Sequence, residues 1–392
     1  MTTIYRGKHW RTGQGVELEV NGDLITGCRE TQYEGTAWIG PGLIDIQVNG
    51  IGGFNLNDGN CSLETLQNIV GVLHRYGVTR FCPTIITGEY ELMLHGIQTV
   101  AHACREDLQV RNAVLGIHVE GPYISSEDGP RGAHKKEWVR NPDWKEYMAW
   151  QEAAEGRICK VTLAPELPGA IDFIRRLAKE GVVPAIGHSA ATEQEIRQAV
   201  EAGARMSTHL GNGSHLMLPR HPNYIWAQLA EDRMWAGLIG DGFHLPLSTL
   251  KSMLRAKGRK AIITSDASYL AGMPAGTYDS HNGKVVLEPN GHLHLADSPG
   301  ILAGSALPLS TALAVMSSHG ICTLGESIDM ASLHPAELFG LDRTGAGGLE
   351  IGSPADMIVY TSNDNSIFRI DKTISRGNVV YDREAEQAVR PT

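Results

Sequence analysis

The chain has 392 residues, 42% of them hydrophobic and 20% charged, a balance typical of a globular protein with a large core. Its formal net charge is −10 and it has no basic run, so we expect no nucleic-acid partner. No apolar window approaches the roughly 20 residues that span a bilayer, and no signal-like segment opens the chain. The six cysteines lack CxxC spacing, so free thiols and a cytoplasmic location are expected.

The two ends of the chain have the same sequence pattern. The first 40 residues contain short alternating segments such as GVELEVNGDLITGCRE, separated by turn signals, which predict β strands. The segment from 346 to 392 reads the same way. We therefore predict that residues 1–40 and 346–392 form a small β-sandwich domain beside a larger domain spanning residues 41–345.

From Gly42 onward, short β-branched runs alternate with amphipathic segments. Segments such as SLETLQNIVGVLHRYG and TEQEIRQAVEAG have apolar residues at helical spacing and end at glycine, so they predict helices. The predicted strands cover residues 42–47, 78–87, 113–120, 158–164, 182–188, 205–209, 234–241 and 261–266. Eight strands alternating with helices predict an α/β fold of the (β/α)8 barrel type, with an open doubly wound sheet as the alternative.

Two further segments interrupt this alternation. The stretch YISSEDGPRGAHKKEW, which follows the third strand, is long and polar and is a candidate lid. Residues 277–296 predict a β-hairpin inserted after the last barrel strand.

Polar side chains gather at the predicted carboxyl ends of the strands, where barrel enzymes carry their chemistry. A lone strand-end histidine is often a satisfied core residue. Glu120, His188 and His209 together, however, form a common catalytic zinc set that leaves one position open for water. His118 shares a face with Glu120 and is expected to lie deeper. The other strand ends contribute Asn212, Asp241, His244 and Asp266.

The first barrel strand ends differently, in DIQVNG. Side chains alternate along a strand, so Gln47 and Asn49 point to the same side where the strand stops. An amide neither titrates near neutral pH nor binds a metal strongly. This strand end therefore brings hydrogen-bonding groups, not metal ligands.

These motifs, taken in order from Pro41 to the AGSALPL segment at 303–309, resemble the N-acetylglucosamine-6-phosphate deacetylase family of the amidohydrolase superfamily. The closing GSPADMIV also resembles these enzymes. Most amidohydrolases carry His-x-His on the first strand for a second metal, whereas these deacetylases can carry Gln-x-Asn. The resemblance implies one divalent metal per subunit, zinc, with iron, cobalt and manganese left open. It also argues against hydantoinases, dihydroorotases and ureases. We expect Gln47 to occupy the second-metal position beside the ligands and Asn49 to brace the adjoining loop.

The resemblance also implies a role for each strand-end group. Glu120, His188 and His209 correspond to the metal ligands. Asp266 corresponds to the base that takes a proton from water and returns it to the leaving amine. His244 joins the catalytic set and also contacts substrate. The other implied substrate contacts are Gln47, Ala133, His134, Asn212, Gly213, Arg220, Asp241, Leu302, Ala303 and Gly304.

The phosphate-binding segment departs from the family pattern. The family reads close to THLYNAM…GREPG, whereas this chain has THLGNGSHLMLPRHPN. By position, Asn212 and the N–H of Gly213 bind the 6-phosphate, together with Arg220 lent by the neighbouring subunit of a homodimer. Because these residues differ from the family pattern, a substrate that lacks the phosphate remains an alternative.

The sequence therefore predicts a metal-dependent amide hydrolase that removes acetate from an N-acetylated amino sugar 6-phosphate. One alternative keeps the reaction but acts on another N-acyl sugar or N-acyl amine. A second is a non-catalytic sugar-binding barrel, against which Asp266 and the metal set argue, because a binding module needs no proton shuttle. The glucosamine or galactosamine epimer is left open.

Overall fold

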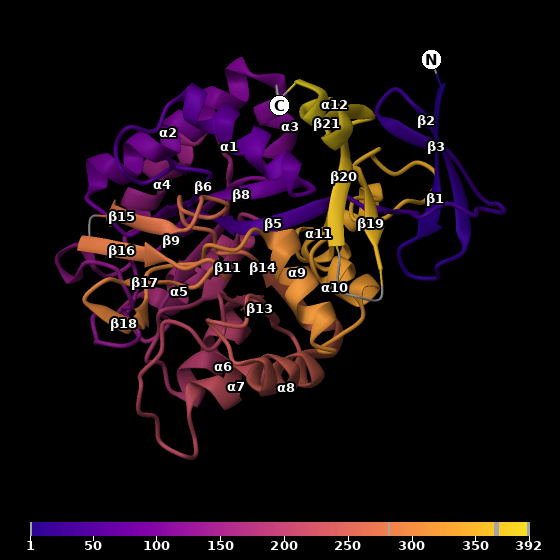
Figure 1. The fold of residues 1–392 in the computed structure, drawn as a ribbon. Coiled ribbons are helices and arrows are strands. Elements are labelled where there is room, and N and C mark those ends of the chain that lie inside the picture. The colour runs from indigo at the N-terminus through magenta and orange to yellow at the C-terminus, as the bar shows by residue number, and fades with distance from the viewer. Residues whose placement is uncertain (1, 281–282, 364–367, 390–392) are drawn as a thin grey trace.

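The predicted barrel is present in the computed structural model, which describes residues 2–280, 283–363 and 368–389 (Figure 1). Its parallel sheet has the order β14-β13-β12-β11-β10-β9-β8-β5, and a parallel bridge between Val48 and Ala267 closes it. The strands are β5 (Leu43–Val48), β8 (Val78–Ile86), β9 (Ile117–Glu120), β10 (Ile158–Leu163), β11 (Val183–Ile186), β12 (Met206–Ser207), β13 (Trp235–Ile239) and β14 (Ala261–Thr264). The (β/α)8 prediction is confirmed, and the open doubly wound sheet is wrong.

Helices surround the barrel, and their hydrophobic faces pack on the strands to form the main core. Helix α6 shows why they form where they do: a capping box of Thr192 and Glu195 starts it, and Gly203 ends it with φ +117°. The longer helices are α1 (Leu63–Arg75), α2 (Tyr90–Glu106), α4 (Trp144–Ala153), α5 (Ala170–Lys179), α6 (Glu193–Ala202), α8 (Leu247–Lys257) and α9 (Leu309–Ser318). The shorter ones are α3 (Leu108–Ala113), α7 (Tyr224–Ala230), α10 (Leu324–Met330), α11 (Leu333–Phe339) and α12 (Arg383–Val389).

A second sheet combines both ends of the chain, at the right of Figure 1. Its order is β21-β20-β19-β4-β1-β2-β3, and the antiparallel pairing of β4 with β19 joins the N-terminal strands to the C-terminal ones. The strands are β1 (Thr2–His9), β2 (Gly15–Asn21), β3 (Leu24–Glu30), β4 (Ala37–Pro41), β19 (Met357–Ser362), β20 (Phe368–Ser375) and β21 (Asn378–Asp382). The domain limits at residues 40 and 346 stay a prediction.

The insertion after β14 is larger than the predicted hairpin. It is a four-stranded antiparallel sheet of β15 (Gly276–Ser280), β16 (Gly283–Leu287), β17 (Leu293–Leu295) and β18 (Ser298–Leu302), and the predicted residues His281 and Asn282 lie outside the described ones. The ring of His292 lies 5.1 Å from that of Phe243, so this sheet packs against the loop that follows β13. None of the described helices is long and apolar enough to cross a lipid bilayer.

Candidate active site

The three predicted metal ligands meet at the carboxyl ends of three barrel strands, β9, β11 and β12. Glu120 ends β9, and His188 and His209 each lie two residues beyond β11 and β12. His209 Nε2 lies 3.0 Å from Glu120 Oε1 and 3.1 Å from His188 Nε2, and His188 Nε2 lies 3.4 Å from the same carboxylate oxygen. All three residues are buried.

This triangle fits one divalent cation. Ligand atoms about 2.0–2.1 Å from a tetrahedral zinc ion lie about 3.3–3.4 Å apart, close to the separations observed. His188 Nδ1 donates to the carbonyl of Pro130 at 2.8 Å, which keeps the proton on Nδ1 and leaves the Nε2 lone pair for a metal. Burial raises the pKa of Glu120, but the adjacent imidazoles of His188 and His209 hold that pKa well below its usual value, so the carboxylate is ionised.

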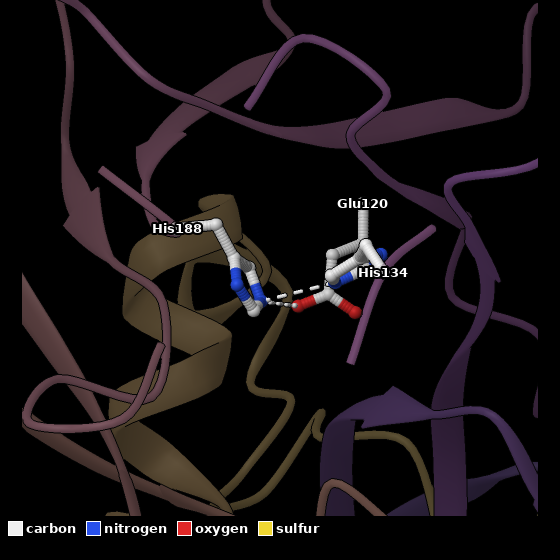
Figure 2. A group of neighbouring side chains, drawn as sticks. All are labelled: Glu120, His134 and His188. Carbon is white, nitrogen blue, oxygen red and sulfur yellow. Dashed lines mark hydrogen bonds and ion pairs between the residues drawn. The ribbon is translucent and has the colours of Figure 1, made fainter. Parts of the chain in front are cut away.

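His134 extends this cluster from the loop after β9. Figure 2 shows His188 facing both Glu120 and His134, and the ligand-type atoms of these three residues lie within 4.8 Å of one another. His134 Nε2 lies 3.2 Å from His188 Nε2, and burial together with His188 lowers the pKa of His134 to about 3. His209 approaches the same pair, Glu120 and His188, from the residues just beyond β12. Both histidines therefore reach this cluster, and the metal role predicted for His209 and the substrate role predicted for His134 stay predictions.

The backbone at these strand ends is strained. Among the described residues, five that are not glycine have positive φ, and three of them are His188 (51°), His209 (29°) and Asp266 (49°). Such conformations cost about 1–3 kcal/mol each and gather at functional sites, where the surroundings impose them. The strain therefore supports this end of the barrel as the reactive one.

Asp266 follows β14 and completes the site from the eighth strand. Burial and the nearby Glu120 carboxylate raise its pKa. Asn49 Nδ2 donates to Asp266 Oδ1 at 2.9 Å, and Gln47 Nε2 donates to Glu120 Oε1 at 2.8 Å. Gln47 thus lies beside the metal ligands, as expected from the sequence. Asn49 reaches Asp266 in addition to the adjoining loop.

His244, in the loop after β13, has a fixed orientation. Its Nδ1 is 2.7 Å from Asp241 Oδ2, and the other oxygen of Asp241 accepts the backbone N–H groups of Phe243 and His244 at 2.9 Å. Burial raises the pKa of Asp241, but the contact with His244 brings that pKa below its usual value. Asp241 therefore orients His244, and the direct substrate contact predicted for Asp241 stays a prediction.

The profile of the amidohydrolase family matches residues 38–380. An N-acetylglucosamine-6-phosphate deacetylase from Bacillus subtilis (strain 168) is 31% identical over 364 residues, covering 92% of this chain and 89% of that protein. The chain belongs to the N-acetylglucosamine-6-phosphate deacetylase family of amidohydrolases.

Two further relatives of this deacetylase family member are informative. An N-acetylgalactosamine-6-phosphate deacetylase from Shewanella sp. (strain ANA-3) is 33% identical over 384 residues, covering 95% of this chain and 92% of that one. The crystal structure of an N-acetylglucosamine-6-phosphate deacetylase from Pasteurella multocida superposes with a TM-score of 0.85 at 26% identity, covering 96% and 99% of the two chains.

The segment predicted to bind phosphate lies partly beside His209 and partly on an exposed loop. Asn212 and Gly213 follow His209, and Asn212 Nδ2 is buried with no hydrogen-bond partner among the described residues. Gly213 has φ +55°, and a Cβ there would lie 2.7 Å from His188 Nδ1, so this position requires glycine. Arg220 is exposed on the loop that extends away from the barrel before α7 (Figure 1).

The remaining predicted substrate contacts lie next to His134 and near the residues that follow Asp266. Ala133 is exposed next to His134. Leu302 ends β18, Ala303 N–H donates to the carbonyl of Leu293, and a Cβ on Gly304 would lie 3.2 Å from Ser268 Cβ, two residues after Asp266. The structure thus brings residues 302–304 to the eighth strand end.

Two groups that the sequence did not single out also hold this site. Glu166 accepts hydrogen bonds from Ser189 Oγ at 2.7 Å and Ala190 N–H at 2.6 Å, which fixes the loop directly after His188. Its place in LAPE, at the end of the fourth strand, was an available signal. No sequence signal could have identified the Pro130 carbonyl that binds His188, because every residue carries a carbonyl. His118, as predicted, lies deeper, hydrogen-bonded to threonines of neighbouring strands.

Proposed function

We propose that this protein hydrolyses the acetamide of N-acetylglucosamine 6-phosphate and releases acetate. The observation that carries the proposal is the convergence of Glu120, His188 and His209 on one point beside Asp266, in a chain that belongs to a family of deacetylases. A sugar-binding module would not need a base held next to a metal site.

Zinc is the proposed ion, one per subunit. The set of two imidazoles and one carboxylate suits zinc, and the amides at the end of β5 replace the histidines that a second ion would need. When bound, a divalent ion supplies Lewis acidity that polarises the acetyl carbonyl and makes water a stronger acid.

Side chains of the protein carry out the proton transfers and hold the substrate. Asp266 takes a proton from the attacking water and then delivers it to the amine nitrogen, because an amine leaves poorly unless it is protonated. His134, whose lowered pKa keeps it neutral, lies where it can contact the acetyl group. His244, oriented by Asp241, directs Nε2 towards a sugar hydroxyl.

The phosphate would be held by Asn212, the backbone N–H of Gly213 and Arg220. Support comes from the unpartnered buried amide of Asn212 and from the exposure of Arg220, which leaves its guanidinium available to the second site of a homodimer. Leu216 and Met217, on the same loop, are 99% and 88% exposed, an exposure that a subunit contact would remove. We also propose a cytoplasmic location, for which the buried free thiols of Cys61, Cys82 and Cys104 are suited.

The substrate can be tested by comparing kcat/KM for acetate release from N-acetylglucosamine 6-phosphate, the unphosphorylated sugar and N-acetylgalactosamine 6-phosphate. Hydrogen bonds to a charged group are each worth about 1.5–3 kcal/mol, so the phosphate should raise kcat/KM by at least about tenfold. Equal values with and without the phosphate would refute the phosphate site. A preference for the galactosamine sugar would move the proposal to the activity named for the Shewanella relative.

A further inference from the structure

The first barrel strand ends with two amides, and each donates to one carboxylate of the site. Gln47 Nε2 binds Glu120 Oε1 at 2.8 Å, and Asn49 Nδ2 binds Asp266 Oδ1 at 2.9 Å. We propose that Asn49 is a positioning residue that aims Asp266 at water and at the leaving amine, while Gln47 positions Glu120. This inference rests on the proposed function.

Asn49 is itself held firmly, which a positioning residue requires. Its backbone N–H donates to the carbonyl of Ala267 at 2.9 Å, and its own carbonyl accepts the N–H of Leu56 at 3.1 Å. Val48 and Ala267 form the parallel bridge that closes the barrel. Backbone and side chain of Asn49 therefore hold two consecutive residues, Asp266 and Ala267, so the carboxylate moves only with the first strand.

Asp266 needs such a hold because its backbone lies in the left-handed region, with φ +49°. Conformations of this kind persist only where the surroundings impose them. The backbone N–H of the preceding residue, Ser265, donates a hydrogen bond to the buried Asp45 at 3.1 Å. Asn49 fixes the side chain of Asp266 itself. Both the backbone and the carboxylate at the end of the eighth strand are therefore anchored to the first strand.

The contact also separates the roles of the two oxygens of Asp266. Asn49 engages Oδ1, and Oδ2 is then the oxygen that we assign to proton transfer. An amide suits this task because it donates without titrating near neutral pH and without binding metal strongly. A histidine at position 49 would titrate near pH 6.5 and would compete for both the proton and the ion.

The two amides should have separable effects. Loss of Asn49 should act on the chemical step, because a misplacement of about 1 Å can reduce turnover by about 10²-fold. Loss of Gln47 should act on the ion, because a group that hydrogen-bonds a metal ligand contributes about 10- to 100-fold in metal affinity.

Asn57 offers a matched control on the same loop. Its Nδ2 donates to the carbonyl of Thr84 at 3.0 Å and approaches the carbonyl of Asn49 at 3.5 Å, and its Oδ1 accepts the N–H of Ile86. N57A therefore loosens the loop that contains Asn49 without removing a hydrogen bond to Asp266. Its effect measures loop bracing alone.

The experiment measures kcat and KM for acetate release, zinc affinity against a fluorescent chelator, and Tm, for the full-length variants N49A, N49D, Q47A and N57A. We expect N49A to lower kcat about 10- to 100-fold, with KM and zinc affinity within about threefold of wild type. Q47A should weaken zinc about 10- to 100-fold, a loss of affinity that N49A should not show. N57A should keep kcat.

N49D preserves the size of the side chain and therefore keeps the test valid if N49A folds poorly. It replaces the donor with an acceptor against Asp266, so kcat should fall at least as far as in N49A. Unchanged kcat in both variants, or an equal loss in N57A, would overturn the inference. A zinc-loaded wild type that releases no acetate from any N-acetylated sugar phosphate would overturn the proposed function and the inference with it.

Discussion

Replacing Gly213 with alanine should weaken metal binding while the barrel stays folded. The new Cβ would lie 2.7 Å from His188 Nδ1 and 2.9 Å from its Cε1, both below the 3.0 Å at which a neighbouring atom must move. The ring has little freedom to retreat. Its Nδ1 is bound to the Pro130 carbonyl at 2.8 Å, and a Cβ on Gly132 would lie only 3.2 Å from its Cε1.

Two costs combine at this position. A non-glycine residue at φ +55° loses about 1–2 kcal/mol from the left-handed backbone alone. Moving the His188 ring against its bond to Pro130 should in addition weaken zinc affinity about 10- to 100-fold. The backbone cost lowers the free energy of unfolding with or without zinc. The loss of zinc affinity is seen only when zinc binding itself is measured.

Gly156 provides the matched control, because it has φ +78° and nothing within 4 Å of an added Cβ. G156A should lose about 1–2 kcal/mol of stability in urea unfolding, and G213A at least as much. Only G213A should lose zinc affinity in a chelator competition and lose turnover at limiting zinc. G213A that binds zinc as tightly as G156A would refute the placement of this backbone against the ligand.

Three further changes test other parts of the account. D241N removes the carboxylate that orients His244, so kcat/KM for acetate release should fall about 10²-fold at unchanged zinc content, and full activity would contradict that orientation. E166Q loosens the loop after His188, and equilibrium dialysis should show about tenfold weaker zinc binding; wild-type affinity would argue against it. Burial lowers the pKa of His74 in the folded protein to about 4. As the pH falls below 6.5, His74 is therefore protonated in the unfolded chain before it is protonated in the folded one, which destabilises the fold. Wild type should therefore lose about 3 kcal/mol more stability than H74Q between pH 7 and 4, and parallel curves for the two proteins would contradict this.

The sequence predicted the barrel because its signals are local. Each strand is a short β-branched run, each helix has its own periodicity and cap, and parallel strands in a barrel place their carboxyl ends together. Glu120, His188, His209 and Asp266 could be grouped for that reason alone, before any distance was known.

Contacts that depend on closure of the barrel could not be predicted in this way. The bond from Asn49 to Asp266 joins residues 217 positions apart, and only the meeting of first and eighth strands brings them within reach. The loop containing His134 follows no periodic pattern, and its position depends on contacts such as that of Pro130 with His188. The engagement of Asp241 by His244 likewise became visible only in the folded turn.

The most direct test of the account is acetate release by D266N, measured beside wild type with the bound metal of both proteins determined. We expect one equivalent of divalent metal in each protein, with turnover reduced about 10²- to 10⁴-fold in D266N because the proton carrier is lost. Two equivalents of metal in the active wild type, or undiminished turnover in D266N, would contradict it.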